Sequence, residues 1–329
     1  MMNQPPLISV VVIGHNEGQR LIRCLTSVRE CSYPNIELLY IDSHSSDDSV
    51  AQAANLSDSV YLASQKGAAA ARNVGLAHAQ GDWIMFLDGD TILAPLFLSQ
   101  ALADLQADTQ LACAWGHRVE KDPQQSIYVR VLDLDWRYPP GETAFCGGDA
   151  LFRREALLQV EGFNARLLAG EEPEICFWLR KKGWKIMHLD LAMTQHDLAI
   201  TQFKQYWQRT CRAGYAYAAV SAMTQDFWIQ EVRHNYRQSS ILLSLMLIFM
   251  LGAIWQPLLS AAALLTLTLL MLRSSWRARW RSPHWHNLLL YGVHSWFAQI
   301  PITMGIWRCK RDRAAKRRAS FGNYKEVKK

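Results

Sequence analysis

The chain has 329 residues, which is enough for one large domain or two small ones. Half of the residues are hydrophobic and the formal net charge is +6, but neither property is spread evenly. The seven cysteines are scattered, odd in number and contain no Cys-x-x-Cys pair, which argues against a disulfide framework or a cysteine zinc site and indicates reduced thiols. The N-terminus lacks the features of a signal peptide, so we expect the first two-thirds of the chain to fold in the cytosol.

Short apolar runs alternate with helical patterns over the first ninety residues. The apolar runs predict strands at 8–13, 36–41, 60–62 and 83–87. The intervening segments predict helices around 21–28, 51–54 and 67–79. The run at 83–87 is continuously hydrophobic, as is typical of a strand buried on both faces. Strict alternation of strand and helix predicts a parallel α/β sheet.

Polar residues follow the ends of these predicted strands. His15 and Glu17 follow the first strand, Asp42 the second, and Asp88 and Asp90 the fourth. Because such sheets bind ligands beyond the carboxyl ends of their strands, we expect these side chains to share one crevice. Two carboxylates this close at the end of a buried strand repel each other unless a cation lies there, and Mg²⁺ or Mn²⁺ is the simplest candidate. The alternative for the acidic pair is an ordinary surface turn.

The alanine-rich helix predicted at 67–79 carries Arg72. Its guanidinium is a fixed cation suited to a pyrophosphate group. The alternative is that Arg72 is a simple surface residue.

Four motifs occur in order between residues 9 and 91. They are Val-Val-Ile-x-x-Asn-Glu, a loop similar to Ile-Asp-Ser-x-Ser-x-Asp, Gly-x-x-x-Ala-Arg-Asn-x-Gly, and Phe-Leu-Asp-x-Asp. Together they resemble family 2 glycosyltransferases with the GT-A fold. The resemblance implies an α/β domain with a mostly parallel sheet and a nucleotide-sugar donor. The donor-binding residues that it implies are Ile13, His15, Glu17, Asp42, Arg72, Asp88 and Gly89, and the implied metal ligands include Asp88 and Asp90. Ile13, His15 and Ser43 differ from the residues usual in the family, so the nucleotide stays open.

Three acids precede or begin a predicted helix in the middle of the chain. Glu171, Glu172 and Glu174 surround Pro173, where the helix dipole favours negative charge, and that alone would explain them. The resemblance implies instead that one acid is the catalytic base, with Glu172 the first choice and Glu171 the second. A carboxylate suits an inverting transfer because it accepts the proton of the attacking hydroxyl, and a neighbouring acid raises its pKa.

Two further groups are implied by the same resemblance. Gly147, Gly148 and Asp149 stand where the family contacts the acceptor or the donor sugar, and we predict acceptor binding, although a tight turn is the alternative. His196 follows a strand predicted at 185–189 and would complete the metal site, since imidazole is an acceptable ligand for Mn²⁺. A structural histidine is the alternative.

The composition changes beyond residue 198. Aromatic and basic residues mix between 199 and 238, as on helices that lie at a membrane surface. No charged side chain occurs between Arg237 and Arg273, and Gln256-Pro257 divides this apolar run, which predicts a membrane hairpin. A third apolar stretch, 287–307, has basic segments on both sides, so we expect it to be re-entrant or interfacial, with a third crossing as the alternative.

We therefore predict four regions in chain order. They are a GT-A catalytic domain at 1–198, amphipathic juxtamembrane helices at 199–238, a membrane hairpin plus the third apolar segment at 239–307, and a basic cytosolic tail at 308–329. Anionic membrane lipid, and not nucleic acid, is the expected partner of the basic residues.

The predicted activity is an inverting, Mg²⁺- or Mn²⁺-dependent glycosyl transfer. It would move a sugar from a nucleotide-diphosphate sugar to a polyprenyl-linked acceptor or growing glycan at the cytosolic face of the inner membrane. The alternatives are a processive polysaccharide synthase, which would normally show Gln-x-x-Arg-Trp, and a non-catalytic membrane scaffold that retains the fold. The sugar, the nucleotide, the acceptor and the oligomeric state do not follow from the sequence.

Overall fold

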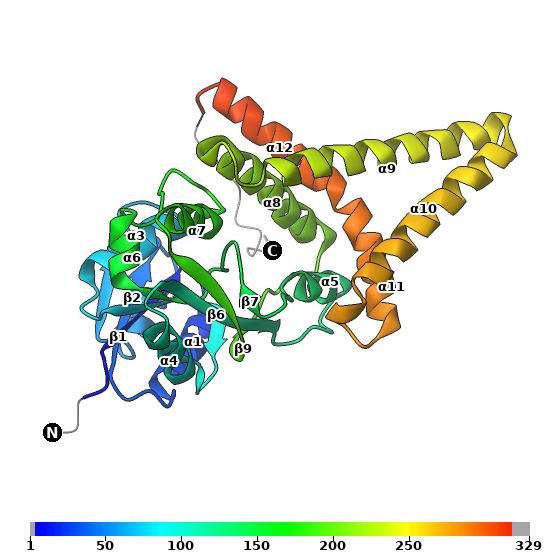
Figure 1. Ribbon diagram of the computed structural model, residues 1–329. Coiled ribbons are helices and arrows are strands. Elements are labelled where there is room, and N and C mark those ends of the chain that lie inside the picture. The colour runs from blue at the N-terminus through cyan, green and yellow to red at the C-terminus, as the bar shows by residue number, and fades with distance from the viewer. Residues whose placement is uncertain (1–3, 318–329) are drawn as a thin grey trace. The chain divides into compact units, whose positions relative to one another are not determined.

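The computed structural model describes residues 4–317 (Figure 1), so Arg318 and the rest of the predicted basic tail lie outside the described residues. The chain forms two compact units. One unit contains the residues up to Lys121 together with Trp136–Leu198, and the other contains Asp122–Asp135 together with the residues from Ala199 onward. The short excursion at Asp122–Asp135 was not predicted from the sequence.

The first unit is built on a sheet of nine strands in the described residues. Their order is β3-β2-β1-β4-β8-β6-β9-β5, with β7 paired to β9 outside this path. The strands are β1 Ile8–Gly14, β2 Ile36–Asp42, β3 Ser59–Leu62, β4 Trp83–Asp88, β5 Thr91–Leu93, β6 Leu111–Glu120, β7 Gly141–Glu142, β8 Ala150–Arg153 and β9 Lys185–His196. The strands β1, β2, β3 and β4 are mutually parallel and β6 is parallel to β9, whereas β5, β7 and β8 run antiparallel to their neighbours. The predicted mixed α/β fold with a mostly parallel sheet is confirmed.

The helices of this unit connect the strands. They are α1 Gln19–Arg29, α2 Ser49–Ala54, α3 Ala68–His78, α4 Phe97–Ala107, α6 Arg154–Gln159 and α7 Glu171–Lys181. The chain winds outward from β1 through β2 to β3, and α3 then returns it to β4 on the other side of β1. Open α/β sheets bind ligands at such a reversal. Here the two strand ends are tied together, because the Gly89 N–H donates to the Ile13 carbonyl at 2.8 Å.

A close glycine contact fixes α3 on this sheet. A Cβ added to Gly75 would come within 2.2 Å of Cγ1 of Val11 in β1, so only glycine allows the helix to lie this near. Arg72 lies three residues earlier and therefore on the same face of the helix. The Arg-Asn-x-Gly motif thus combines a tight helix–strand contact with an arginine directed to the interior.

The strands on the far side of β4 differ from the sequence prediction. The sequence analysis did not predict β6, and it ended the last strand at Leu189, whereas β9 continues to His196. The pairing of β6 with β9 contains register shifts near Gly116, and this irregularity obscures the period-two pattern.

The second unit is helical. Its elements are α5 Ile127–Asp135, α8 Phe203–Thr224, α9 Ile229–Trp255, α10 Pro257–Arg277, a 3₁₀ turn at Arg279–Arg281, α11 Trp285–Phe297 and α12 Gln299–Ala314. The predicted hairpin is present, since α9 and α10 pair and are joined by Gln256 alone (Figure 1). Gly252 allows the close approach, because a Cβ there would lie 2.7 Å from the backbone nitrogen of Ser260. Within residues 4–317, α9 and α10 are the two helices long and apolar enough to cross a membrane.

The third apolar stretch is not one straight helix. It divides at Ala298 into α11 and α12. Pro301 has no N–H to donate to the carbonyl of Phe297, which explains the break. The 13 residues of α11 reach about 20 Å, less than the ~30 Å hydrocarbon core.

Candidate functional site

The acidic pair lies at the carboxyl end of β4, beside the end of β1. Asp88 is the last residue of the strand, and its carbonyl accepts hydrogen bonds from the Thr91 hydroxyl at 2.7 Å and the Cys24 thiol at 3.6 Å. Gly89 is buried, and a Cβ on it would lie 3.1 Å from the Ile13 carbonyl. These contacts fix the backbone from which the two carboxylates project.

Arg72 joins acids from two separate segments of the chain. Its Nη2 lies 3.1 Å from Oδ1 of Asp88, and its Nη1 lies 3.0 Å from Oε1 of Glu171 and 2.9 Å from Oε1 of Glu172. Nη2 also donates to the Gly148 carbonyl at 3.4 Å. One guanidinium therefore brings the end of β4 and the first turn of α7 to the same place.

The burial of Arg72 excludes the alternative that it is a simple surface residue. The side chain is 1% exposed, and both of its terminal nitrogens bond to groups of the protein. The Phe163 ring lies under it at 5.5 Å. Arg72 positions the acids around it, and its contact with a donor stays a prediction.

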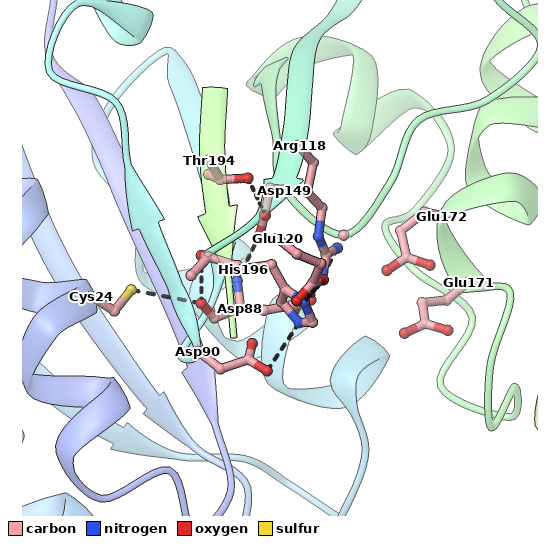
Figure 2. Close-up of polar contacts among 12 residues, drawn as sticks. Cys24, Asp88, Asp90, Arg118, Glu120, Asp149, Glu171, Glu172, Thr194 and His196 are labelled. Carbon is pink, nitrogen blue, oxygen red and sulfur yellow. Dashed lines mark hydrogen bonds and ion pairs between the residues drawn. The ribbon is translucent and has the colours of Figure 1, made fainter. Parts of the chain in front are cut away.

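Glu171 and Glu172 begin α7 after Gly170, which has the left-handed conformation with φ 88°. Both side chains are directed toward the part of the site that holds Asp88 and Asp90 (Figure 2). The side chain of Glu172 is 16% exposed and that of Glu171 is 7% exposed. Burial and the neighbouring charge of Glu171 raise the pKa of Glu172 to about 7, although Arg72 opposes the shift.

His196 lies between two acids because of strand pairing. It is opposite Thr91 of β5 and opposite Glu120 of β6. Its Nε2 lies 3.1 Å from Oδ2 of Asp90, and its Nδ1 lies 2.6 Å from Oε1 of Glu120. Burial and Arg118 lower the pKa of His196, but Asp90 and Glu120 outweigh them and raise it, so the imidazole donates to both acids.

Asp149 is buried within the site, and the acceptor contact predicted for it stays a prediction. The residue is fully buried, its Oδ1 accepts the Asp88 N–H at 2.9 Å, and its Oδ2 accepts the Thr194 hydroxyl at 2.8 Å. Asp149 therefore holds the end of β4 in position.

The glycines before Asp149 differ from each other. A Cβ on Gly148 would lie 2.8 Å from Oδ2 of Asp88 and 3.0 Å from Nη2 of Arg72. A Cβ on Gly147 would meet only the Trp136 ring, at 3.4 Å. Gly148 is thus required for the approach of Arg72 to Asp88, and the acceptor contacts predicted for both glycines stay predictions.

The loops after β1 and β2 form the side of the site predicted to bind the donor. Ile13 is the buried penultimate residue of β1, and His15 and Glu17 follow it, with Glu17 paired to Arg20 at 2.9 Å. Asp42 is buried, and its two oxygens accept the Tyr40 hydroxyl at 2.9 Å and the Ser45 N–H at 2.8 Å. Asp42 therefore shapes this loop, and contact of these residues with a donor stays a prediction.

Two residues of the site, Arg118 and Glu120, were not predicted from the sequence. Arg118 is buried, its Nη1 lies 4.0 Å from Oδ2 of Asp88, and its guanidinium lies 4.4 Å from the Trp136 ring centre. Glu120 completes the pair of acids on His196. The signal was present, because an apolar run from Leu111 ends in polar residues as the other strands do.

The acids outnumber the bases in this site. Two arginines and one histidine face six carboxylates, which are those of Asp88, Asp90, Glu120, Asp149, Glu171 and Glu172.

Within residues 4–317, no group of three or more His, Cys, Asp or Glu side chains is arranged to hold a metal ion. Asp90 and His196 are adjacent, as a shared ligand role requires, whereas Asp88 is turned to Arg72. A carboxylate and an imidazole oriented by a second acid fit a cation that takes its remaining ligands from a bound diphosphate.

Comparison with known proteins connects this geometry to one family. Residues 9–160 match the model of glycosyl transferase family 2. An uncharacterized glycosyltransferase of Haemophilus influenzae is 40% identical over 95 residues, which are 27% of this chain and 38% of that protein. The Escherichia coli protein named UDP-Glc:alpha-D-GlcNAc-diphosphoundecaprenol beta-1,3-glucosyltransferase WfgD is 38% identical over 90 residues, which are 26% of this chain and 36% of that protein. The chain thus spans less than half the length of either relative.

One solved structure is similar over almost the whole chain. It is the mannosyltransferase PcManGT from Pyrobaculum calidifontis in complex with GDP-Man and Mn²⁺, with a TM-score of 0.62 and 18% identity, over 94% of this chain and 89% of that one. At this identity the likeness establishes the fold.

The two neighbouring glycines provide a test of the Arg72 cluster. We expect Gly148→Ala to lower the free energy of unfolding by about 1–3 kcal/mol, since the new methyl group must push Asp88 from Arg72. The matched change Gly147→Ala should cost less than about 0.5 kcal/mol, because its methyl group has room. Urea unfolding of the full chain in detergent measures both. Equal losses would contradict the tight approach at Gly148.

Proposed function

Because residues 9–160 form a glycosyl transferase family 2 domain on a GT-A sheet, we propose that this chain is an inverting glycosyltransferase. It would transfer a sugar from a nucleotide-diphosphate sugar to a polyprenyl-linked acceptor or a growing glycan. The observation that carries the proposal is the meeting of Asp88 and Glu172 on one guanidinium, with Asp90 two residues from Asp88. The acids at the end of β4 and those at the start of α7 can then act on the same bound donor.

Glu172 is proposed as the general base. It is more exposed than Glu171, and a pKa near neutrality suits a group that must take up a proton at the pH of the cytosol. Glu171 has a supporting part, because its charge helps to raise the pKa of its neighbour. Arg72 keeps both carboxylates directed to the end of β4.

Asp90 and His196 are proposed to hold a divalent cation, Mn²⁺ or Mg²⁺. When bound, such a cation supplies charge neutralisation for the departing diphosphate. Glu120 would keep the imidazole oriented through Nδ1 and leave Nε2 for coordination, once its proton is released. The excess of carboxylates in the site supports this part of the proposal.

A lipid-linked acceptor is supported by one relative and by the helical unit. The printed name of WfgD specifies a UDP-Glc donor and an acceptor linked to diphosphoundecaprenol. In this chain, the tryptophans Trp255 and Trp276 are exposed at opposite ends of the α9–α10 hairpin, as at the two surfaces of a membrane. Arg237 and Arg273 both lie toward its open end, which the positive-inside rule assigns to the cytosol. Attachment of this kind would confine enzyme and acceptor to one plane.

The activity is tested by product release. Purified full-length protein is incubated with a panel of nucleotide sugars and Mn²⁺ or Mg²⁺, with or without a polyprenyl-linked acceptor, and nucleoside diphosphate is measured. We expect release that depends on one donor and on the acceptor, and we expect Glu172→Gln to lower kcat by about 10²–10⁴-fold because no base remains. Glu142→Gln, a change of an exposed acid on β7, is the control. Donor binding without turnover, unaffected by Glu172→Gln, would favour a non-catalytic scaffold.

The acid limb of the pH profile tests the assignment of the base. Glu172 must be deprotonated to act, and its pKa is raised to about 7, so kcat/KM should rise with pH up to that region and be lost below it. Glu171→Gln removes a charge that raises this pKa and should move the acid limb to lower pH. A limb that stays at the same pH in Glu171→Gln would contradict the coupling of the two acids.

Metal binding is tested without turnover. We expect Asp90→Ala to abolish the Mn²⁺-dependent part of nucleoside diphosphate binding in calorimetry, and Glu120→Gln to weaken it by about 10–100-fold through loss of the imidazole orientation. Asp82→Ala, at the opposite end of β4, should bind as the unchanged protein does. Unaltered affinity in Asp90→Ala would remove this residue from the metal site.

A further inference from the structure

A cavity of about 610 Å³ lies within the helical unit, between α8 and α12. Large apolar side chains line it, namely Trp207, Met304 and Trp307. Two arginines, Arg308 and Arg311, line it as well. The cavity therefore combines an apolar wall with two arginines, of which Arg308 also lies 3.8 Å from Oδ2 of Asp312.

The cavity is a consequence of how the two helices cross. A Cβ on Gly305 would lie 1.9 Å from the Cys211 carbonyl oxygen, and a Cβ on Gly214 would lie 2.0 Å from the Ile302 carbonyl oxygen. The helices thus touch through their backbones at this crossing. Cys211 and Gly305 also line the cavity. The large side chains therefore lie beside a backbone-to-backbone contact, and the space next to them stays unfilled.

Contacts with α9 give the depth of the cavity relative to the apolar hairpin. The Ser239 hydroxyl lies 2.7 Å from the Gln299 carbonyl and 2.6 Å from Oγ1 of Thr303. One turn earlier in α9, the Tyr236 ring lies 4.8 Å from Nζ of Lys310. The first turns of α12 therefore lie beside Ser239, where the uncharged part of α9 starts. The later residue Lys310 lies beside Tyr236, in the charged N-terminal part of α9. In the membrane topology proposed above, the apolar lining residue Met304 would lie on the hydrocarbon side and the arginines on the headgroup side.

The exposure of the lining residues agrees with this depth. The Trp307 side chain is 62% exposed and that of Met304 is 48% exposed. Exposed apolar side chains beside arginines are unfavourable in water but suit the boundary of a bilayer, where a tryptophan ring lies at the level of the headgroups. Arginine binds phosphate oxygens with a geometry that lysine cannot reproduce.

We propose that this cavity binds one anionic phospholipid of the surrounding bilayer. Its phosphate would lie against Arg308 and Arg311, and the beginning of an acyl chain would lie along Met304, Trp207 and Trp307. The charge and the depth of the lining select a lipid with a net negative headgroup. The inference goes beyond the proposed transfer reaction, and its test requires no turnover.

The test measures lipid retention by native mass spectrometry. Full-length protein in detergent is titrated with phosphatidylglycerol, phosphatidylcholine, polyprenyl phosphate or inorganic phosphate. We expect phosphatidylglycerol to bind more tightly than phosphatidylcholine, and Arg308→Gln/Arg311→Gln to weaken its binding roughly 30-fold, about fivefold for each arginine. The single change Arg311→Gln, at an exposed position, gives the fivefold effect with little risk to folding.

A matched control removes the same charge from the same helix. Lys310→Gln/Arg313→Gln changes two basic residues that do not line the cavity, and it should leave the binding of phosphatidylglycerol almost unchanged. Equal weakening in the two double variants would overturn the proposal, because the attraction would then be a general property of the basic helix. Displacement of the phospholipid by a lower concentration of polyprenyl phosphate would assign the cavity to the acceptor instead. Equal competition by inorganic phosphate would show that the apolar wall has no part.

Discussion

The ion pairs of one buried guanidinium hold together the acids of the candidate site. Arg72 is removed from water, so its charge must be balanced, and the balance comes from β4 and from the first turn of α7. These acids would repel one another without it. Two glycines make the arrangement possible, since Gly75 lets α3 lie against β1 and Gly148 leaves room between the arginine and Asp88. The proposed base and the proposed diphosphate side of the site are therefore positioned by a single side chain.

On the other side of Asp88, strand pairing positions the side chains of the site. The antiparallel pairing of β5 with β9 brings His196 to the loop of Asp90, and the parallel pairing of β6 with β9 brings Glu120 to the same imidazole. Asp149 adds a support from below by accepting the Asp88 N–H. Each of these residues is buried, so the site is largely formed before any ligand arrives.

The first ninety residues could be predicted because their signals are local. A continuous apolar run that ends in acids is enough to give β4 and to place Asp88 and Asp90 at its end, and an alternation of such runs with helices gives the parallel part of the sheet. The partners of Arg72 could not be derived in this way, since they depend on α7, which lies a hundred residues later. β6 was missed because its pairing is irregular near Gly116, and with it Arg118 and Glu120 were missed. The excursion at Asp122–Asp135 leaves no mark in composition, as its helix is short and ordinary.

The hairpin of α9 and α10 is joined by Gln256 alone, and Gly252 packs the two helices closely up to that point. In the topology proposed here, and within residues 4–317, the hairpin would place a single tight bend and no loop on the opposite face of the membrane. Proteases, antibodies or partner proteins on that side would have almost no accessible surface to bind. The proposed enzyme would then expose almost no surface on that face of the membrane. Regulation through a binding partner would have to act from the cytosolic side, where the donor is proposed to bind.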